Sequence, residues 1–232
     1  AVLVELNCET DFVAKDDSFK SFAREIVDAL MSSRPVSVQD AGELELSGGQ
    51  TVEAARQELI AKIGENISLR RFELIEGEAG TLAGYVHGSR IGAVVQLNVA
   101  SAQQVGRDIA MHIAASRPLC VDESAMPAEI LEKERDIYSA QAAESGKPAD
   151  IVEKMVSGRI SKFLKENTLV GQPFVKNPDQ TVGELLSAHD AAVLTMHRFE
   201  VGEGKRAHGG LVRIARLVAG EGLLIAASYS AA

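Results

Sequence analysis

The chain has 232 residues, of which 46% are hydrophobic and 25% charged, and its formal net charge is −9 at pH 7. This composition predicts a folded, water-soluble chain of one domain or two modest ones, and it excludes the disordered class. The negative charge disfavours general binding of nucleic acid through its phosphates, and favours a protein or a small molecule as the partner.

The chain opens on an apolar, β-branched run, AVLVELN at 1–7, which predicts a strand. The stretch LNCETDFVAKDDSF at 6–19 places an aromatic residue, Phe12, among polar and charged neighbours. Apolar residues at helical spacing then predict a helix from Phe19 to Leu30. Phe12 is therefore expected in a strand-to-helix turn, either packed beneath the turn or offered to a partner.

Residues 34–50 are rich in Pro and Gly, and they predict a loop with at most a short helical piece. Apolar positions within 52–63 predict a second amphipathic helix, and Gly64 stands where a C-cap glycine is expected. The segment NISLRRFELIEGE at 66–78 predicts a strand. Its apolar phase slips at 70–71, so we expect a bulge or bend there.

The second half of the chain repeats this order of elements. TLAGYVHGSRIGAVVQLN at 81–98 predicts a β-hairpin, and Ser101 can cap the helix that follows. A capping box at 181–184 predicts a short helix, and a last strand ends in HRFEVGEG at 197–204. Because VLVELN matches AVVQLN and RRFELIEGE matches HRFEVGEG, we predict an α+β fold. Two related subdomains would each carry a small antiparallel sheet backed by helices.

A segment of different character, 126–166, interrupts the second copy. Apolar stripes on both sides of ESGKPAD, residues 144–150, predict an antiparallel helical hairpin that protrudes from the sheet domain. The predicted units are an N-terminal subdomain at 1–77, a C-terminal subdomain at 79–124 and 167–204, the hairpin at 126–166, and an atypical tail at 205–232.

The two copies differ at the start. The second copy has a strand at 82–86 before AVVQLN, whereas nothing precedes VLVELN. We therefore expect the first strand of the N-terminal subdomain to be missing, which would leave an exposed edge that promotes self-association. The alternative is that the C-terminal stretch LVRIARLVAGEGLLIAASY, at 211–229, closes the sheet.

The sequence contains no legible motif for covalent chemistry. SGKP at 145–148 lacks the glycine spacing and the Ser or Thr of a phosphate loop, and neither GxSxG nor HExxH occurs. We predict no catalytic residue, no metal and no cofactor; an enzyme using Asp11 with His87 is disfavoured because no nucleophile or second base accompanies them. Each histidine is expected to be solvated or singly hydrogen-bonded: His87, His112, His189, His197 and His208.

Cys8 and Cys120 are too few for a disulfide framework and form no CxxC motif, so both are expected to be reduced. No segment is apolar over the length of a bilayer span, and the N-terminus shows no basic region followed by an apolar one. These features favour the cytoplasm and disfavour a membrane partner.

The stretch ELNCETDFVAK, residues 5–15, resembles the signature of the elongation factor Ts family, the nucleotide-exchange factors of elongation factor Tu. The resemblance covers residues 1–204. It fails at both ends. Nothing here corresponds to the family's helical N-terminal domain, and the tail after residue 204 does not resemble the family's C-terminal helix. Further stretches resemble the same family: AKIGENISLRR (61–71), YVHGSRIG (85–92), DIAMHIAAS (108–116), GKPADIVEKMVSGRISKF (146–163), GQPFVKNP (171–178) and RFEVGEG (198–204).

The resemblance implies a role for the Asp11-Phe12 pair. In this family the matching pair reaches the G domain of elongation factor Tu near its magnesium and phosphate site, where the aromatic ring wedges between side chains. Guanine nucleotides are held largely through Mg²⁺ and phosphate contacts, so a partner that distorts them weakens GDP binding. The residues alone leave the alternative that Phe12 packs under the turn and Asp11 caps the following backbone.

The resemblance thus implies a guanine nucleotide exchange factor, not an enzyme, that binds elongation factor Tu·GDP in bacterial or organellar-type translation without binding nucleotide itself. The alternative is a module that docks on elongation factor Tu, or self-associates, without efficient exchange. Three of the implied contacts have purely structural alternatives. Ile63 and Gly64 can form a helix C-cap, His87 can be a polar residue of the hairpin turn, and Val175 can be an apolar anchor. The implied partner-binding residues are Thr10, Asp11, Phe12, Val13, Ile63, Gly64, His87, Arg107 and Val175.

Overall fold

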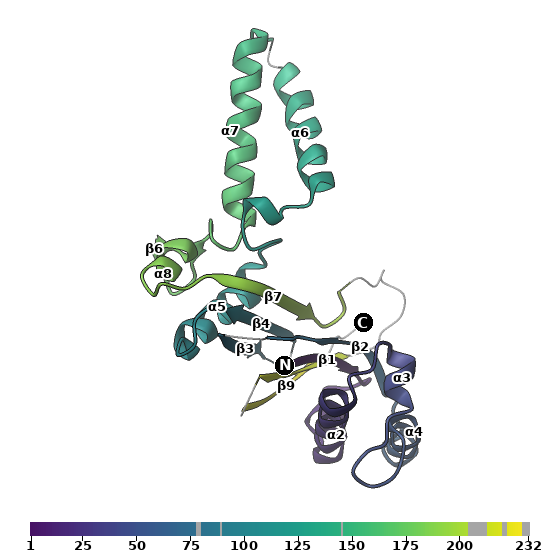
Figure 1. Ribbon diagram of the computed structural model, residues 1–232. Helices are drawn as coiled ribbons and strands as arrows, with labels where there is room; N and C mark the ends of the chain where they lie inside the picture. Colours follow the sequence, from purple (N-terminus) through teal and green to yellow (C-terminus); the bar gives the residue numbers. More distant parts are fainter. Residues whose placement is uncertain (78–79, 89, 145, 204–212, 220–221, 229–232) are drawn as a thin grey trace.

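The computed structural model describes residues 1–77, 80–88, 90–144, 146–203, 213–219 and 222–228, the last two ranges as backbone only (Figure 1). Its α-helices are α1 Asp11–Lys15, α2 Asp17–Ser33, α3 Val38–Gly42, α4 Val52–Ile63, α5 Gln103–Ser116, α6 Ala128–Ala143, α7 Ala149–Asn167 and α8 Val182–Ser187, with a 3₁₀ turn at Glu123–Ala125. Its strands are β1 Val2–Asn7, β2 Ser68–Leu74, β3 Thr81–His87, β4 Ile91–Leu97, β5 Pro173–Phe174, β6 Asn177–Thr181, β7 Val193–Glu200, β8 Arg213–Ala219 and β9 Gly222–Ser228. The mixture of helices and antiparallel sheets confirms the predicted α+β class.

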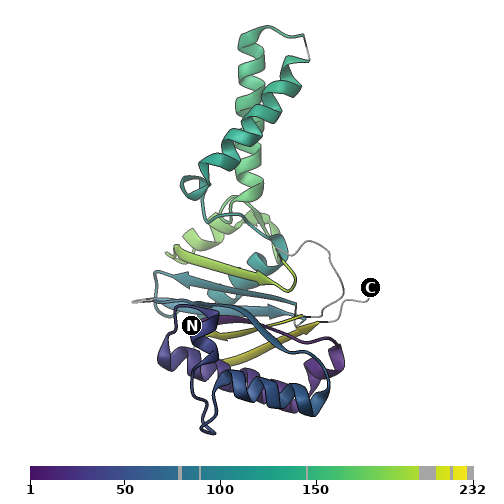
Figure 2. The ribbon, with the colours of Figure 1, turned by 90° about the vertical axis from the view of Figure 1, so that its right-hand side faces the viewer.

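Two antiparallel sheets form the centre of the molecule. One has the strand order β2-β1-β8-β9 and the other β3-β4-β7, while β5 and β6 form a separate small ribbon. The two sheets stack face to face, with α2 and α4 outside the first sheet and α5 outside the second (Figure 2). Both faces of each sheet are therefore covered, which explains why VLVELN and AVVQLN are almost continuously apolar.

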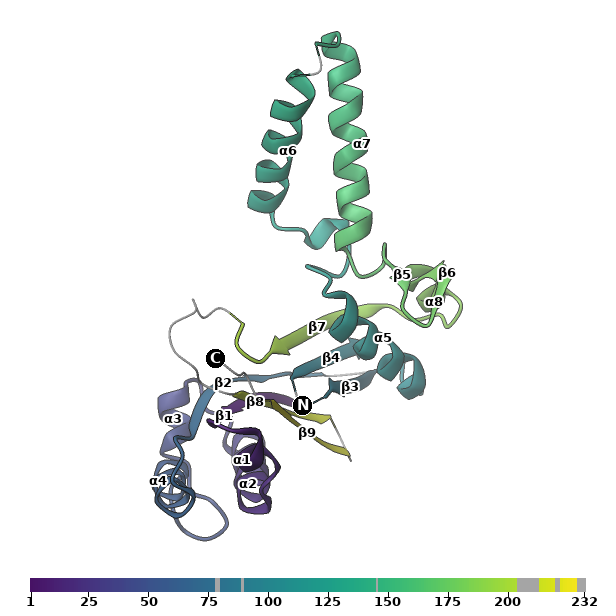
Figure 3. The ribbon, with the colours of Figure 1, turned by 180° about the vertical axis from the view of Figure 1, so that it is seen from behind.

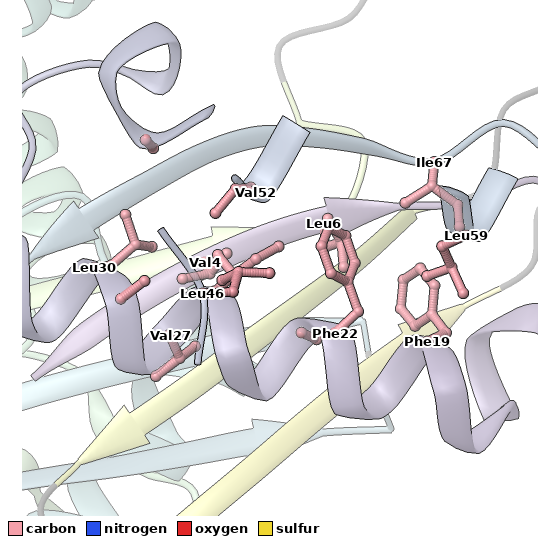
Figure 4. Packing of buried hydrophobic residues seen from close by; sticks show 14 of the residues in the cluster. Val4, Leu6, Phe19, Phe22, Val27, Leu30, Leu46, Val52, Leu59 and Ile67 are labelled. Atoms are coloured by element: carbon pink, nitrogen blue, oxygen red, sulfur yellow. The ribbon is translucent and has the colours of Figure 1, made fainter. Parts of the chain in front are cut away.

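The helix-facing side of β1 packs on α2. Phe19, Phe22 and Leu30 of α2 lie in one buried cluster with Val4 and Leu6 of β1, and Phe22 lies beside Leu6 (Figure 4). Asp16 caps α2 by accepting hydrogen bonds from the Ser18 and Phe19 backbone amides. The periodic apolar face and its cap thus determine where α2 begins and which side it buries.

The opposite side of β1 packs on the second sheet. Leu3 of β1 lies in one buried cluster with Val94 of β4 and Phe199 of β7. The sheets approach so closely that a Cβ added to Gly92 would lie 2.9 Å from Leu3 Cδ1. A larger residue at this glycine would therefore force the buried Leu3 side chain to shift.

The two halves follow the same order of elements. β2 lies beside β1 as β7 lies beside β4, and β8 takes beside β1 the place that β3 takes beside β4. Both α2 and α5 end in Ser-Arg-Pro, and Arg34 and Arg117 of these tripeptides adopt left-handed conformations with φ of 51° and 52°. This arrangement is consistent with a repeat, while the predicted subdomain boundaries stay a prediction.

The expected open edge of β1 is absent, which corrects the prediction of an unpaired strand. β8 pairs with β1 in antiparallel register from Val2↔Val218 to Asn7↔Arg213, and β9 continues the sheet beyond β8 (Figure 3). The alternative, closure by the C-terminal stretch, is therefore correct for the part of 211–229 that is described. The prediction of self-association therefore no longer follows from an open edge at β1.

The bulge predicted at 70–71 is present. Glu5 pairs with Arg71 and Leu6 with Leu69, so Arg70 is the extra residue. Consecutive strand residues normally point to opposite faces. Here the bulge lets both arginines reach the fully buried carboxylate of Glu5, at 2.8 Å from Arg70 Nη1 and 2.6 Å from Arg71 Nε.

The cap predicted for α5 is wrong. Ser101 precedes the N-cap position with φ of 85°, and Ala102, which occupies that position, offers no side-chain acceptor. Thr81 Oγ1 of β3 accepts from the Ala102 backbone amide instead, at 3.2 Å. By contrast, the capping box of Thr181 and Glu184 at α8 is confirmed.

The helices α6 and α7 form an antiparallel hairpin that protrudes from the two-sheet body (Figure 1). Its buried side chains, among them Ala142, Val156 and Ile160, form a cluster of their own. The chain enters and leaves the hairpin side by side, because the Leu169 amide donates to the Cys120 carbonyl at 2.9 Å.

Candidate functional site

The turn that carries Phe12 folds as a short helix, α1, of 5 residues. Phe12 is 82% exposed, while Val13 and Ala14 are buried. The alternative in which Phe12 packs beneath the turn is therefore wrong. Val13 lies in the core, so any part it takes in binding is to hold the turn.

Thr10 is the N-cap residue of α1, so the alternative in which Asp11 provides the cap is also wrong. Thr10 Oγ1 accepts from the Val13 amide at 3.4 Å, a long hydrogen bond. Asp11 forms an ion pair with Lys15 at 2.9 Å, one helical turn away. The acidic side chain beside Phe12 thus has a partner within the same helix.

Glu65 connects the two parts of the predicted site that are distant in sequence. One carboxylate oxygen accepts from the Thr10 amide at 2.9 Å and the other from Thr10 Oγ1 at 2.6 Å. Glu65 follows Gly64, which ends α4 in a left-handed conformation with φ of 83°. Thr10, Phe12, Ile63 and Gly64 therefore belong to one region of the surface.

Sequence reasoning missed Glu65. Ile63 is partly buried against the core and Gly64 is exposed. The left-handed conformation of Gly64 confirms the predicted C-cap. The available signal was a carboxylate directly after a C-cap glycine. That signal indicates no partner, because Thr10 lies 55 residues earlier in the chain.

His87 and Val175 line one surface pocket of about 500 Å³, together with Tyr85, Met111 and Arg198. His87 is exposed, and its Nδ1 lies 3.2 Å from the Tyr85 hydroxyl. Val175 is 43% exposed. The structure thus brings these two predicted residues together, in a depression that combines an apolar wall with polar side chains.

The predicted residue Arg107 is exposed on α5 and does not line this pocket. Its neighbour Asp108 forms an ion pair with Lys176 at 2.5 Å, which ties α5 to the loop that carries Val175. The structure gives Arg107 no common site with His87.

His112 corrects the expectation that every histidine is solvated or singly bonded. It is fully buried, its Nδ1 accepts from the Val175 amide at 3.1 Å, and its Nε2 lies 2.9 Å from Gln172 Oε1. Since Nδ1 accepts, the ring is neutral and Nε2 donates. Burial lowers the pKa of His112, which is consistent with this neutral form. The ring fixes the loop that presents Val175.

The other histidines differ among themselves. His189 Nδ1 lies 2.9 Å from the Leu185 carbonyl, a single contact of the expected kind. His197 lies 2.8 Å from the carboxylate of Glu73 and connects β7 with β2. His208 lies outside the described residues.

A cluster of arginines and carboxylates, which we call the joint cluster, connects the first sheet with the end of β7. The Arg71 guanidinium lies 4.0 Å from the centre of the Phe199 ring and donates to the Glu200 carbonyl at 3.2 Å. Neighbouring Arg198 and Arg117 hold the pKa of Glu200 below its ordinary value. The members of the joint cluster are Glu5, Arg70, Arg71, Arg117, Arg198, Glu200 and Glu203.

Both cysteines are free and buried, as expected for reduced thiols. Burial, with the nearby charge of Glu65 as the next cause, raises the pKa of the Cys8 thiol to about 12, so the thiol is protonated and unreactive. Among the described residues, no group of His, Cys, Asp and Glu side chains is arranged to hold a metal ion. Within the same residues, no helix has the length and apolar character needed to cross a membrane.

Comparison with known proteins finds one family along most of the chain. The family model described as Elongation factor TS matches residues 9–203. The Elongation factor Ts of Methylococcus capsulatus (strain Bath) is 57% identical over 204 residues, which cover 88% of this chain and 69% of that protein. The Elongation factor Ts of Thioalkalivibrio sulfidiphilus is 56% identical over 205 residues, with the same two shares. That of Legionella pneumophila (strain Paris) is 51% identical over 204 residues, again covering 88% and 69%.

Proposed function

Since the chain belongs to the elongation factor Ts family and has a role in translation elongation, we propose that it binds elongation factor Tu·GDP and promotes the release of GDP. The observation that carries this proposal is the exposure of Phe12, which is 82% accessible on a turn anchored by buried neighbours. An aromatic ring with this exposure buries little apolar area, so it contributes little to the stability of the free protein. Its position favours insertion into a partner.

The proposed mechanism requires no covalent step. Phe12, with Asp11 beside it, enters the G domain of elongation factor Tu near the magnesium and phosphate site. There it displaces the side chains that hold the magnesium ion and the phosphates of GDP. Because GDP binding depends on those contacts, the affinity for GDP falls. By linkage, GDP weakens the binding of this chain to elongation factor Tu by the same factor.

A second contact region is proposed around the pocket of His87 and Val175. Its apolar wall and its arginine and glutamate side chains suit an apolar side chain of the partner with polar neighbours. Arg107 is proposed as a further contact outside this pocket. The role implies the cytoplasm, or an organelle with bacterial-type translation.

Stopped-flow release of a fluorescent GDP analogue from elongation factor Tu of Methylococcus capsulatus, with excess unlabelled GDP, tests the proposal. The release rate should rise with the concentration of this chain and saturate. Phe12→Ala is the matched variant, since the substituted side chain is exposed. Binding without faster release would contradict the proposal and would favour the alternative of a docking module.

The linkage provides an independent check. The affinity of this chain for nucleotide-free elongation factor Tu and for its GDP complex can be measured by calorimetry. Their ratio should equal the factor by which the chain weakens GDP binding. Equal affinities for the two forms would rule out exchange by this mechanism.

A further inference from the structure

The direction of Phe12 depends on contacts outside its own helix. With 5 residues, α1 is far shorter than the roughly 12–15 residues that an isolated helix needs to be even marginally stable in water. The burial of Val13 and Ala14 holds one side of α1 on the core. Its N-terminal end, next to Phe12, needs a separate anchor.

Glu65 provides this anchor through Thr10. Its two carboxylate oxygens accept from the amide and the hydroxyl of the same residue, at 2.9 and 2.6 Å. The Thr10 hydroxyl in turn accepts from the Val13 amide at 3.4 Å. Hydrogen bonds to a carboxylate acceptor are stronger than those between neutral groups, so Glu65 is a suitable anchor for the start of α1.

The remaining polar group of Thr10 is also occupied. Its carbonyl accepts from the Ala14 amide at 3.2 Å and from the Cys8 thiol at 3.2 Å. All the polar atoms of Thr10 therefore have partners within the chain. Thr10 is better described as the support of α1 than as a contact with another protein.

The position of Glu65 is itself determined by the end of α4. The Gly64 amide donates to the Ile60 carbonyl at 2.8 Å, and the left-handed conformation of Gly64 turns the chain directly before Glu65. The C-cap of α4 thus holds the carboxylate that supports the short helix α1.

We propose that Glu65 is a positioning residue for nucleotide exchange, which holds Thr10 so that Phe12 is presented in its binding direction before the partner arrives. This inference rests on the proposed function. Without Glu65, the cost of ordering α1 falls on the association step. Because that cost applies equally to every bound state, KM rises while kcat is maintained.

The first experiment needs no partner. Hydrogen exchange of the Val13 and Ala14 amides, measured by NMR, reports the opening of α1. Glu65→Ala should accelerate their exchange about tenfold, the factor that corresponds to about 1.4 kcal/mol, and Glu65→Gln should do so by less. Glu9→Gln is the control, since it removes the same charge from an exposed neighbouring position.

The second experiment measures the exchange kinetics of the same variants with elongation factor Tu. Glu65→Ala should raise KM about tenfold with kcat within a factor of two. Thr10→Val, which removes the hydroxyl, should raise KM more than Thr10→Ser, which keeps it. A merely structural role would lower the melting temperature of these variants but would not make KM depend on the Thr10 hydroxyl.

The outcomes separate the two proposals. Unchanged amide exchange and unchanged KM in Glu65→Ala would overturn the positioning role. Faster amide exchange with no GDP release from the wild-type protein would overturn the proposed function and leave the anchoring of Phe12 intact. A fall in kcat with unchanged KM would overturn the positioning role, and Glu65→Gln with Thr10→Val decide the matter if Glu65→Ala fails to fold.

Discussion

Phe12 and Phe19 are the same residue type 7 positions apart, and their environments are opposite: Phe12 is 82% exposed and Phe19 fully buried. Their substitution by alanine should therefore separate binding from stability. Phe12→Ala is expected to change the free energy of unfolding by less than about 0.5 kcal/mol, and Phe19→Ala to lower it by about 3–5 kcal/mol. Thermal and urea denaturation measure both values.

The same Phe12→Ala variant should lose GDP-release activity. If Phe12 is a central contact worth about 2 kcal/mol, kcat/KM falls about 30-fold. A variant that melts well below the wild type would place Phe12 in the core. Full activity in a folded variant would remove Phe12 from the proposed mechanism.

His112 makes stability depend on pH in a defined direction. The folded protein holds the neutral ring, and burial lowers its pKa, while the unfolded chain keeps an ordinary value of about 6.5. The unfolded state thus binds the proton more readily, so stability is retained above pH 6.5 and is lost as the pH falls below it. Urea denaturation should show a smaller free energy of unfolding at pH 5 than at pH 7.

His112→Gln is the matched variant for this measurement, because its side chain does not titrate. It should be less stable than the wild type at pH 7 but should lose less stability between pH 7 and pH 5. The carboxylates with lowered pKa values, such as Glu53 at about 2, contribute their losses at lower pH. An identical pH dependence in the variant would assign the effect to other groups.

At the scale of elements, the ends of α2 and α5 give a paired test. Arg34 and Arg117 both occupy left-handed C-cap positions, where a residue with a Cβ costs roughly 1–2 kcal/mol relative to glycine. Arg34 forms an exposed ion pair with Glu76, a class worth about 0–1 kcal/mol. Arg34→Gly should therefore raise the melting temperature by a few degrees.

Arg117→Gly should gain less, or lose stability, since Arg117 belongs to the joint cluster through Glu200 and Glu203. Differential scanning calorimetry of both variants makes the comparison. Equal gains would mean that the joint cluster adds nothing to the stability of the end of α5.

At the scale of the whole molecule, the helical hairpin is attached at a closed base. The Leu119 amide donates to the Asn167 carbonyl and the Leu169 amide to the Cys120 carbonyl, at 2.8 and 2.9 Å. Replacing residues 128–163 by a short Gly-Ser linker should therefore leave the two-sheet body folded. Circular dichroism should show less helix and a retained cooperative transition, since the buried cluster of the hairpin is separate. A body that unfolds without the hairpin would contradict the proposed domain division.

The sequence by itself determined the features that depend on near neighbours. Helix periodicity, the capping box at Thr181 and the bulge at 70–71 each follow from residues within a few positions of one another. The family signature around Phe12 is equally local. Such features were predictable because propensity and hydrogen-bond geometry act over short stretches of chain.

Only the tertiary structure decided which distant groups meet. Glu65 meets Thr10 across 55 positions, Gln172 meets His112 across 60, and the backbone of β8 pairs with β1 from the far end of the chain. A carboxylate or an imidazole gives the same signal in a sequence whether it is solvated or buried against a partner. Its environment depends on how the two sheets stack and on which faces the helices cover, and these are properties of the packed chain rather than of any single segment.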